Sequence, residues 1–317
     1  MHYHSTVQFK FFCSYQPISN NRPLMSCMKI ALLFFILTQA LTSTAQAESI
    51  NFPELIESAE FAEAAYLTED EIDRFVQSKN YRLTRHHTLP EIQLSYFIAT
   101  DEAAKTHIIS VRGTSNVENT LLDIALKLTQ NQHTGLRLHS GFSSAAAQAY
   151  AEIKPLLNRD YVINTTGHSL GGAVALVLAM YLDKDAFRVG QVITFGQPKV
   201  TNIAGARKYQ HLNVIRVVTP LDVVPLVPPF DPLDINNLDI YWHSGKEVLL
   251  EADTRYSLLE GVNSMLRATR FTQQRPSEEN LANHKMSFYL ELLNKKKRQS
   301  TEVPYKNSLN LFNLFGN

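Results

Sequence analysis

Cysteine is almost absent from this chain, which has two in 317 residues, Cys13 and Cys27. Both lie near the N-terminus, before an apolar run that we interpret as part of a leader. A chain that loses both has neither disulfides nor a thiolate nucleophile, so a full hydrophobic core must hold it together. Thiol enzymes and cysteine-ligated zinc sites are therefore excluded for the processed protein.

Acidic side chains are missing from residues 1–47, a stretch that carries three basic side chains. Within it, Met28 and a lysine precede the apolar run 30–37, and the small residues of Ala45-Gln46-Ala47 follow. This order is typical of a secretory signal peptide, and the apolar run is too short to span a bilayer. We therefore expect 1–47 to be an N-terminal extension plus signal peptide, with the true start at Met28, or alternatively at Met25, and cleavage after Ala47. The alternatives are a buried helix or an uncleaved anchor.

Net charge is also absent, because 30 basic side chains balance 30 acidic ones. No surplus of positive charge points to nucleic acid as a partner. Without residues 1–47 the chain keeps 270 residues, 27 of them basic and 30 acidic. We expect this mature protein to have no transmembrane helix and to be secreted, either to a periplasm or to the medium. Its histidines lack the spacing of metal ligands, so we expect no metal and no cofactor.

Strand and helix patterns alternate along the body of the chain. Helices are predicted at 52–67, 69–77, 142–157, 170–182 and 281–293 with a short one near 203, and strands at 81–88, 92–99, 106–111, 161–166, 189–195 and 213–218. The alternation predicts an α/β fold, with a mostly parallel sheet and helices on both faces. In such sheets the chemistry lies at the carboxyl ends of the strands.

We expect one domain over residues 48–294 and a basic, apolar tail over 295–317. The basic run at the start of this tail fits either a solvated helix end or attraction to anionic lipid. Its apolar end could dock on the body of the protein, on a membrane or on a partner, and the sequence does not choose among them.

The strongest signal for chemistry is the turn Gly167-His168-Ser169-Leu170-Gly171-Gly172, between a predicted strand and a predicted helix. A serine on such a turn has a strained backbone, so its neighbours two residues away must be small. Gly167 and Gly171 meet that requirement. The turn lifts the Ser169 hydroxyl above the sheet and leaves the Leu170 N–H at a helix start, where it can bind an oxyanion.

A serine nucleophile needs a base that is held by an acid. On this fold the acid follows the serine in the chain, at the end of a strand. Asp222 fits, because it follows the strand 213–218 and precedes a proline-rich segment of restricted entropy. The alternative is a structural role, in which the aspartate only caps a turn. Other carboxylates in a looser segment nearby are Asp231, Asp234 and Asp239.

The base is a histidine that follows the acid in the chain. His168 adjoins the serine and points elsewhere, and His211 precedes Asp222. His243 lies between two strand-like segments, and His284 lies near the start of the last predicted helix. Chain order alone does not separate these two.

Several motifs, taken together, resemble the class 3 lipases related to fungal triacylglycerol lipases. The matching segments are Val111-Arg112-Gly113-Thr114-Ser115, His139-Ser140-Gly141-Phe142, the Gly167–Gly172 turn, Thr194-Phe195-Gly196-Gln197-Pro198, Asp222-Val223-Val224-Pro225, His243-Ser244-Gly245 and Asn283-His284. The resemblance implies an α/β-hydrolase fold with Ser169, Asp222 and His284 as the triad and His243 as a structural residue. It also implies an oxyanion hole at Thr114 and Leu170, which agrees with the need for two preorganised donors.

The same resemblance implies a lid over residues 116–135. Its apolar side chains Leu121, Leu122, Ala125, Leu126 and Leu128 form one stripe, which predicts an amphipathic helix. Such a helix could open on a lipid surface, or it could pack permanently on the body. Two positions depart from the family pattern: Thr120 replaces the usual lid tryptophan, and Thr201 stands where glycine is common. The first departure puts interfacial activation in doubt.

Together these features predict a secreted serine ester hydrolase, a lipase that cleaves acylglycerols through an acyl-enzyme. The alternatives within enzymes are a phospholipase A1 and an esterase of short-chain or phenolic esters. Outside enzymes, the alternative is a lipid- or partner-binding protein on an inactive hydrolase fold, which the intact triad argues against.

Overall fold

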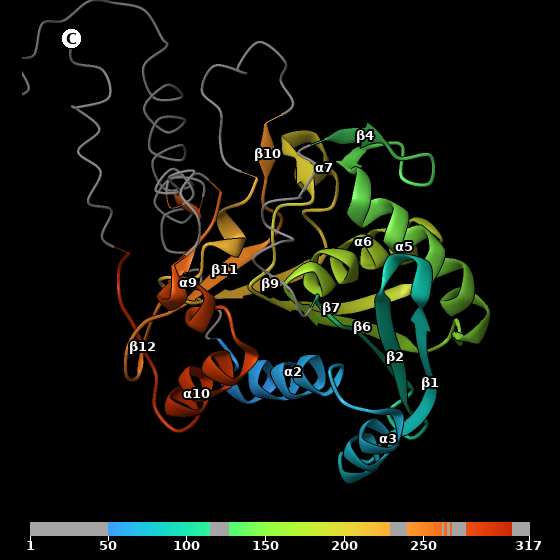
Figure 1. Ribbon diagram of the computed structural model, residues 1–317, viewed down its shortest axis with the longest axis horizontal. Helices are drawn as coiled ribbons and strands as arrows, with labels where there is room; N and C mark the ends of the chain where they lie inside the picture. The colour runs from blue at the N-terminus through green and yellow to red at the C-terminus, as the bar shows by residue number, and fades with distance from the viewer. Residues whose placement is uncertain are drawn as a thin grey trace, which may run out of the picture. The chain divides into compact units, whose positions relative to one another are not determined.

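A computed structural model describes residues 50–114, 127–228, 240–261 and 277–305, together with residues 263, 264 and 267 (Figure 1). The signal peptide and cleavage site that we expect in residues 1–47 lie outside this described part. From Asn51 onward the chain forms one unit, distinct from Met1–Ile50.

A nine-stranded sheet forms the centre of this unit, in the order β1-β2-β3-β6-β7-β9-β11-β12-β13. Its strands are β1 (Arg82–Leu89), β2 (Leu94–Asp101), β3 (Thr106–Val111), β6 (Val162–His168), β7 (Arg188–Phe195), β9 (Asn213–Val218), β11 (Lys246–Leu250), β12 (Arg255–Leu259) and β13 (Thr301–Glu302). Neighbours from β3 to β11 run parallel, β12 and β13 are also parallel, and the β1-β2-β3 and β11-β12 pairs are antiparallel. The predicted mostly parallel sheet is confirmed.

Helices cover both faces of this sheet (Figure 1). On one face lie α2 (Phe52–Ala64) and α10 (Met286–Lys296), and on the other lie α5 (Ser140–Ile153) and α6 (Leu170–Lys184). Because both faces are covered, central strands such as β3 are buried along almost their whole length. Every residue of α6 from Gly171 to Leu182 is buried, which explains why this helix is apolar all round.

The shorter elements complete the described part of the chain. They are α3 (Glu69–Ser78), α7 (Ile203–Lys208), α9 (Glu278–Asn283) and the 3-10 turns η1 (Pro90–Ile92), η2 (Lys154–Leu156) and η3 (Val224–Leu226). A second, four-stranded sheet has the order β10-β8-β5-β4, with β10 (Tyr241–Trp242), β8 (Thr201–Asn202), β5 (Arg137–His139) and β4 (Leu128–Gln130). Our sequence analysis did not predict this sheet, because strands of two or three residues carry no periodic pattern.

One residue of the predicted lid helix lies in this second sheet. Leu128, expected on the apolar stripe of a helix, belongs to β4 and lies opposite His139 in an antiparallel pair. Pairing with β5 satisfies its backbone in the strand, so the prediction of helix at Leu128 was wrong. Residues 116–126 of the predicted lid lie outside the described residues.

The predicted last helix, 281–293, is two helices, α9 and α10, which are separated at His284 and Lys285. Helix α10 continues past the tail boundary that we expected at residue 294. Lys296 is buried, and its ammonium donates to the carbonyls of Glu251 and Asp253 at 2.8 Å. This lysine is therefore directed inward, away from any anionic surface. Among the described residues, no helix is both long and apolar enough to cross a membrane.

Candidate active site

Ser169 lies between the last residue of β6 and the first residue of α6. Its backbone has φ 58° and ψ −131°, a combination that is strained for any residue with a side chain. The N–H of Ser169 donates to the carbonyl of Phe195 at 2.8 Å, which ties the turn to the end of β7. The strained strand-to-helix turn expected from the sequence is confirmed.

The end of β3 packs directly against this turn. A Cβ added to Gly171 would overlap the carbonyl oxygen of Val111 and lie 2.6 Å from the carbonyl carbon of Arg112. A Cβ added to Gly113 would lie 3.0 Å from the Cβ of Ser169. Thr114 therefore follows directly after a residue that touches the serine. Leu170 opens α6, where the backbone N–H has no acceptor within the helix.

Asp222 and His284 form a buried pair, although 62 positions separate them in the chain. The Nδ1 atom of His284 lies 2.8 Å from Oδ2 of Asp222, and the two residues expose 2% and 1% of their surfaces. A buried carboxylate of this kind fixes the imidazole tautomer with the proton on Nδ1. Nε2 of His284 is buried and has no hydrogen-bond partner within the described part of the chain, so its lone pair is available to a hydroxyl.

The carboxylate of Asp222 accepts three hydrogen bonds. Oδ2 accepts from the Tyr289 hydroxyl at 2.5 Å as well as from His284, and Oδ1 accepts from the Val224 N–H at 2.9 Å. Burial by itself would raise the pKa of Asp222, but the facing His284 and these donors outweigh it and hold the pKa below its ordinary value. Asp222 therefore stays ionised, as an acid that orients an imidazole must.

Gly196 lies against this pair from the end of β7. It has φ +57°, and a Cβ at this position would lie 2.8 Å from Oδ2 of Asp222 and 2.8 Å from Cε1 of His284. Only glycine leaves room for the pair while it adopts this backbone conformation. The Thr194–Pro198 motif in the sequence contained this glycine, but it did not reveal the role.

The loop that carries His284 is attached to the loop that carries Asp222. The Thr219 hydroxyl donates to the carbonyl of Asn283 at 2.9 Å, and the Asn280 side chain donates to the carbonyl of Leu221 at 2.8 Å. The His284 N–H bonds back to α9 at the carbonyl of Asn280. These bonds fix the backbone position of His284 and therefore the position of its imidazole.

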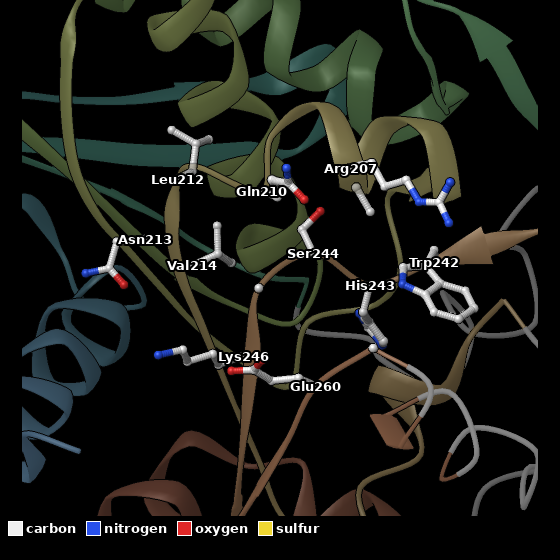
Figure 2. Close-up of a pocket in the computed structure, with 13 residues that line it drawn as sticks. Arg207, Gln210, Leu212, Asn213, Val214, Trp242, His243, Ser244, Lys246 and Glu260 are labelled. Carbon is white, nitrogen blue, oxygen red and sulfur yellow. The ribbon is translucent and has the colours of Figure 1, made fainter. Parts of the chain in front are cut away.

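His243, the other histidine left open by chain order, lies elsewhere. Its Nε2 donates to the carbonyl of Pro225 at 2.7 Å, and burial together with nearby Arg216 and Lys199 puts its pKa well below the ordinary value. Figure 2 shows His243 and Ser244 on the wall of a pocket of about 330 Å³, at the start of β9 and β11. Asp222 instead follows the end of β9. Of the two histidines, His284 is the one that the structure places on Asp222.

The remaining residues singled out in the sequence take supporting positions. His211 is exposed and lies 3.0 Å from Asp183. His139 caps α5 and stacks on Phe142 at 3.9 Å between ring centroids. The alternative acids Asp231, Asp234 and Asp239 lie outside the described residues. Within the residues that the structure does describe, no group of three His, Cys, Asp or Glu side chains could hold a metal ion.

The model of one protein family, described as lipase (class 3), matches residues 108–231. This span contains Ser169, Asp222, Thr114 and Leu170. Over this span the chain is similar to the class 3 lipase family. The span ends before His284, so the place of this histidine rests on the geometry above.

Curated relatives match less than half of this chain. A secreted mono- and diacylglycerol lipase of Fusarium solani is 37% identical over 142 residues, which cover 42% of this chain and 42% of the relative. A lipase of Rhizopus oryzae is 29% identical over 146 residues, with 42% and 37% covered. The chain thus spans about two fifths of the length of these relatives.

Solved lipase structures show the same fold. The mono- and diacylglycerol lipase of Aspergillus oryzae matches with a TM-score of 0.62 at 19% identity, over 74% of this chain and 96% of that one. The lipase of Rhizopus microsporus var. chinensis matches with a TM-score of 0.55 at 26% identity, over 65% and 77%. The predicted α/β-hydrolase fold is confirmed.

Proposed function

We propose that this protein is a secreted serine ester hydrolase that cleaves acylglycerols through an acyl-enzyme. The observation that carries the proposal is the buried Asp222–His284 pair, which His168 links to the turn that carries Ser169. The His284–Asp222 bond of 2.8 Å leaves Nε2 as the basic atom, and Ser169 lies on the strained turn that presents such a nucleophile.

In this proposal Ser169 attacks the ester carbonyl carbon while Nε2 of His284 accepts the hydroxyl proton. Asp222 holds the imidazole and balances the charge that it gains. The tetrahedral intermediate then collapses, the C–O bond of the ester breaks, and His284 returns the proton to the departing alcohol. Water repeats the sequence on the acyl-enzyme and releases the fatty acid and free Ser169.

Thr114 and Leu170 are the proposed oxyanion donors. Two N–H groups that converge beside the serine would bind the oxygen as its negative charge develops, and no reorganisation is then needed during the reaction. The contact of Gly113 with Ser169 and the position of Leu170 at the start of α6 support this assignment.

The acylglycerol substrate is proposed from the relatives, whose printed names include mono- and diacylglycerol lipases. Secretion is supported by the leader pattern in residues 1–47 and by the secreted relative from Fusarium solani. We also propose that the expected lid, residues 116–135, makes the peripheral contact with a lipid surface.

The test is incubation of the protein with a defined lipid mixture of triolein, diolein, monoolein and phosphatidylcholine, followed by mass spectrometry. Ser169→Ala is the matched control. Serine-dependent release of oleate and lower glycerides is expected. Serine-dependent lysophosphatidylcholine without glyceride cleavage would replace the proposal with phospholipase A1. Absence of serine-dependent release would contradict hydrolysis of these lipids.

A further inference from the structure

His168, the residue before the serine, forms a hydrogen bond with the backbone of His284. Its Nε2 atom lies 2.6 Å from the carbonyl oxygen of His284, and its Nδ1 atom lies 2.8 Å from the hydroxyl of Tyr66. The rings of His168 and His284 are 4.5 Å apart. His168 thus joins the base of the proposed triad to a tyrosine that follows α2.

The direction of each bond follows from the chemistry of its atoms. A carbonyl oxygen only accepts, so Nε2 of His168 carries the proton and Nδ1 has a lone pair. The Tyr66 hydroxyl must therefore donate to Nδ1, and its oxygen packs against Gly113, where an added Cβ would lie 2.5 Å from it. The result is a continuous series of contacts from Gly113 through Tyr66 and His168 to His284.

The series connects three segments that the proposed reaction needs. Gly113 precedes the oxyanion residue Thr114, His168 precedes the nucleophile, and His284 is the base. A histidine that merely fills the core would have no reason to bind these three segments together. Tyr66 comes from a fourth segment, and it exposes 37% of its surface although its hydroxyl points inward to His168.

The charge of His168 suits this role. Burial, and then the facing His284, lower the pKa of His168 to about 3, so its imidazole is neutral at neutral pH. A second positive ring beside His284 would oppose the charge that His284 gains as it accepts the serine proton. A neutral donor can instead hold the carbonyl of His284 without raising this electrostatic cost.

We propose that Tyr66 and His168 act as one positioning unit, which fixes the position of the His284 backbone relative to the Gly113–Thr114 segment. The inference rests on the proposed function, because it assigns the unit to the base and the oxyanion donors of that reaction. Neither residue touches the reacting atoms. Loss of the unit should lower kcat more than it changes KM, because it displaces catalytic groups and leaves the surface for the acyl chain in place.

The experiment compares Tyr66→Phe, His168→Gln and the double variant on a soluble ester, p-nitrophenyl butyrate. Phenylalanine removes only the hydroxyl, and glutamine keeps a donor for the His284 carbonyl while it loses the acceptor for Tyr66. We expect each single variant to lose about tenfold in kcat with KM within about twofold of wild type. The kcat of the double variant should be no more than about threefold below that of the worse single variant, since the effects of substitutions at coupled residues are not additive.

Tyr150→Phe is the matched control, because it removes a hydroxyl that donates to Asp185 at the same distance of 2.8 Å, away from the site. It should unfold at a lower urea concentration than wild type but keep its kcat. Independent, multiplicative losses in the double variant, or a wild-type kcat in Tyr66→Phe, would overturn the positioning unit. If a variant is poorly folded, titration of reactive serine with a fluorophosphonate corrects kcat to the folded fraction.

The same reagent separates the two proposals. If wild-type protein is not labelled at Ser169, the proposed function fails. If wild-type protein is labelled and Tyr66→Phe and His168→Gln react at the wild-type rate per folded molecule, the positioning unit alone fails.

Discussion

The hydroxyl of Tyr289 and the imidazole of His284 donate to the same oxygen, Oδ2 of Asp222, at 2.5 and 2.8 Å. Tyr289 lies in the first turns of α10, five residues after the histidine, and it is fully buried. The acid of the proposed triad is therefore held from two sides. The tyrosine orients the carboxylate, and the carboxylate orients the imidazole.

Tyr289→Phe should weaken this arrangement without destroying it. The carboxylate loses a hydrogen bond but keeps those from His284 and the Val224 N–H, so we expect a loss of about 1.5–3 kcal/mol in the free energy of unfolding. The kcat should fall by about tenfold or less, because the second orienting contact is gone. Urea unfolding and ester hydrolysis measure the two effects, and an unchanged value of both would show that the tyrosine does not support the acid.

His284→Ala and His243→Ala should have opposite profiles. Loss of His284 removes the base, so turnover should fall by about 10³-fold or more in a protein that still folds. Loss of His243 breaks its bond to the carbonyl of Pro225 and leaves a cavity, so stability should fall while kcat per folded molecule stays near wild type. The reverse pair of results would exchange the roles of the two histidines.

Ser169→Gly should separate catalysis from backbone strain. Both Ser169→Gly and Ser169→Ala remove the nucleophile, but only glycine relieves the strain at φ 58°. We expect both variants to be inactive and the glycine variant to be more stable than the alanine variant by about 1 kcal/mol. An alanine variant that is clearly more stable than the glycine variant in urea unfolding would contradict strain at this turn, because glycine loses more conformational entropy on folding.

Gly196→Ala should displace the Asp222–His284 pair. The added methyl would meet both side chains at 2.8 Å, and a shift of this size in catalytic groups costs about 100-fold in kcat. Gly135→Ala is the control, because Gly135 has φ +72° but nothing lies within 4 Å of its added Cβ. Gly135→Ala should be less stable than wild type but keep its kcat. If the two variants lowered kcat equally, the loss at Gly196 would come from backbone strain and not from the clash.

Stability should fall as the pH drops below about 6.5. The pKa of His168 is lowered to about 3 and that of His243 is well below its ordinary value, so the unfolded chain takes up protons there that the folded protein excludes. Through His168 the free energy of unfolding then falls by about 1.4 kcal/mol per pH unit from about pH 6 to 4.5, His243 adds a loss in the same direction, and neither group lowers the stability above pH 7. Urea unfolding at several pH values in this range gives the free energy of unfolding as a function of pH. This free energy should fall less steeply with decreasing pH in His243→Gln than in wild type, and the same pH dependence in both would contradict the prediction.

Much of the fold could be predicted because its signals are local. Strand β3 and strand β9 were expected at the residues where they occur, since each is rich in the β-branched residues Ile, Val and Thr. The break between α9 and α10 was missed, because apolar spacing continues through His284 while the backbone leaves the helix there. The second sheet was missed because its short strands are stable only when they are paired.

Two kinds of information therefore define this protein. The chain alone specifies the class of fold, the strained turn at Ser169 and the order of nucleophile and acid, because each depends on residues that are close in sequence. The choice of His284 over His243, the support from Tyr289, and the series that links Gly113, Tyr66, His168 and His284 depend on segments up to 218 positions apart. These contacts come from side-chain packing in three dimensions, and no local pattern in the sequence encodes them.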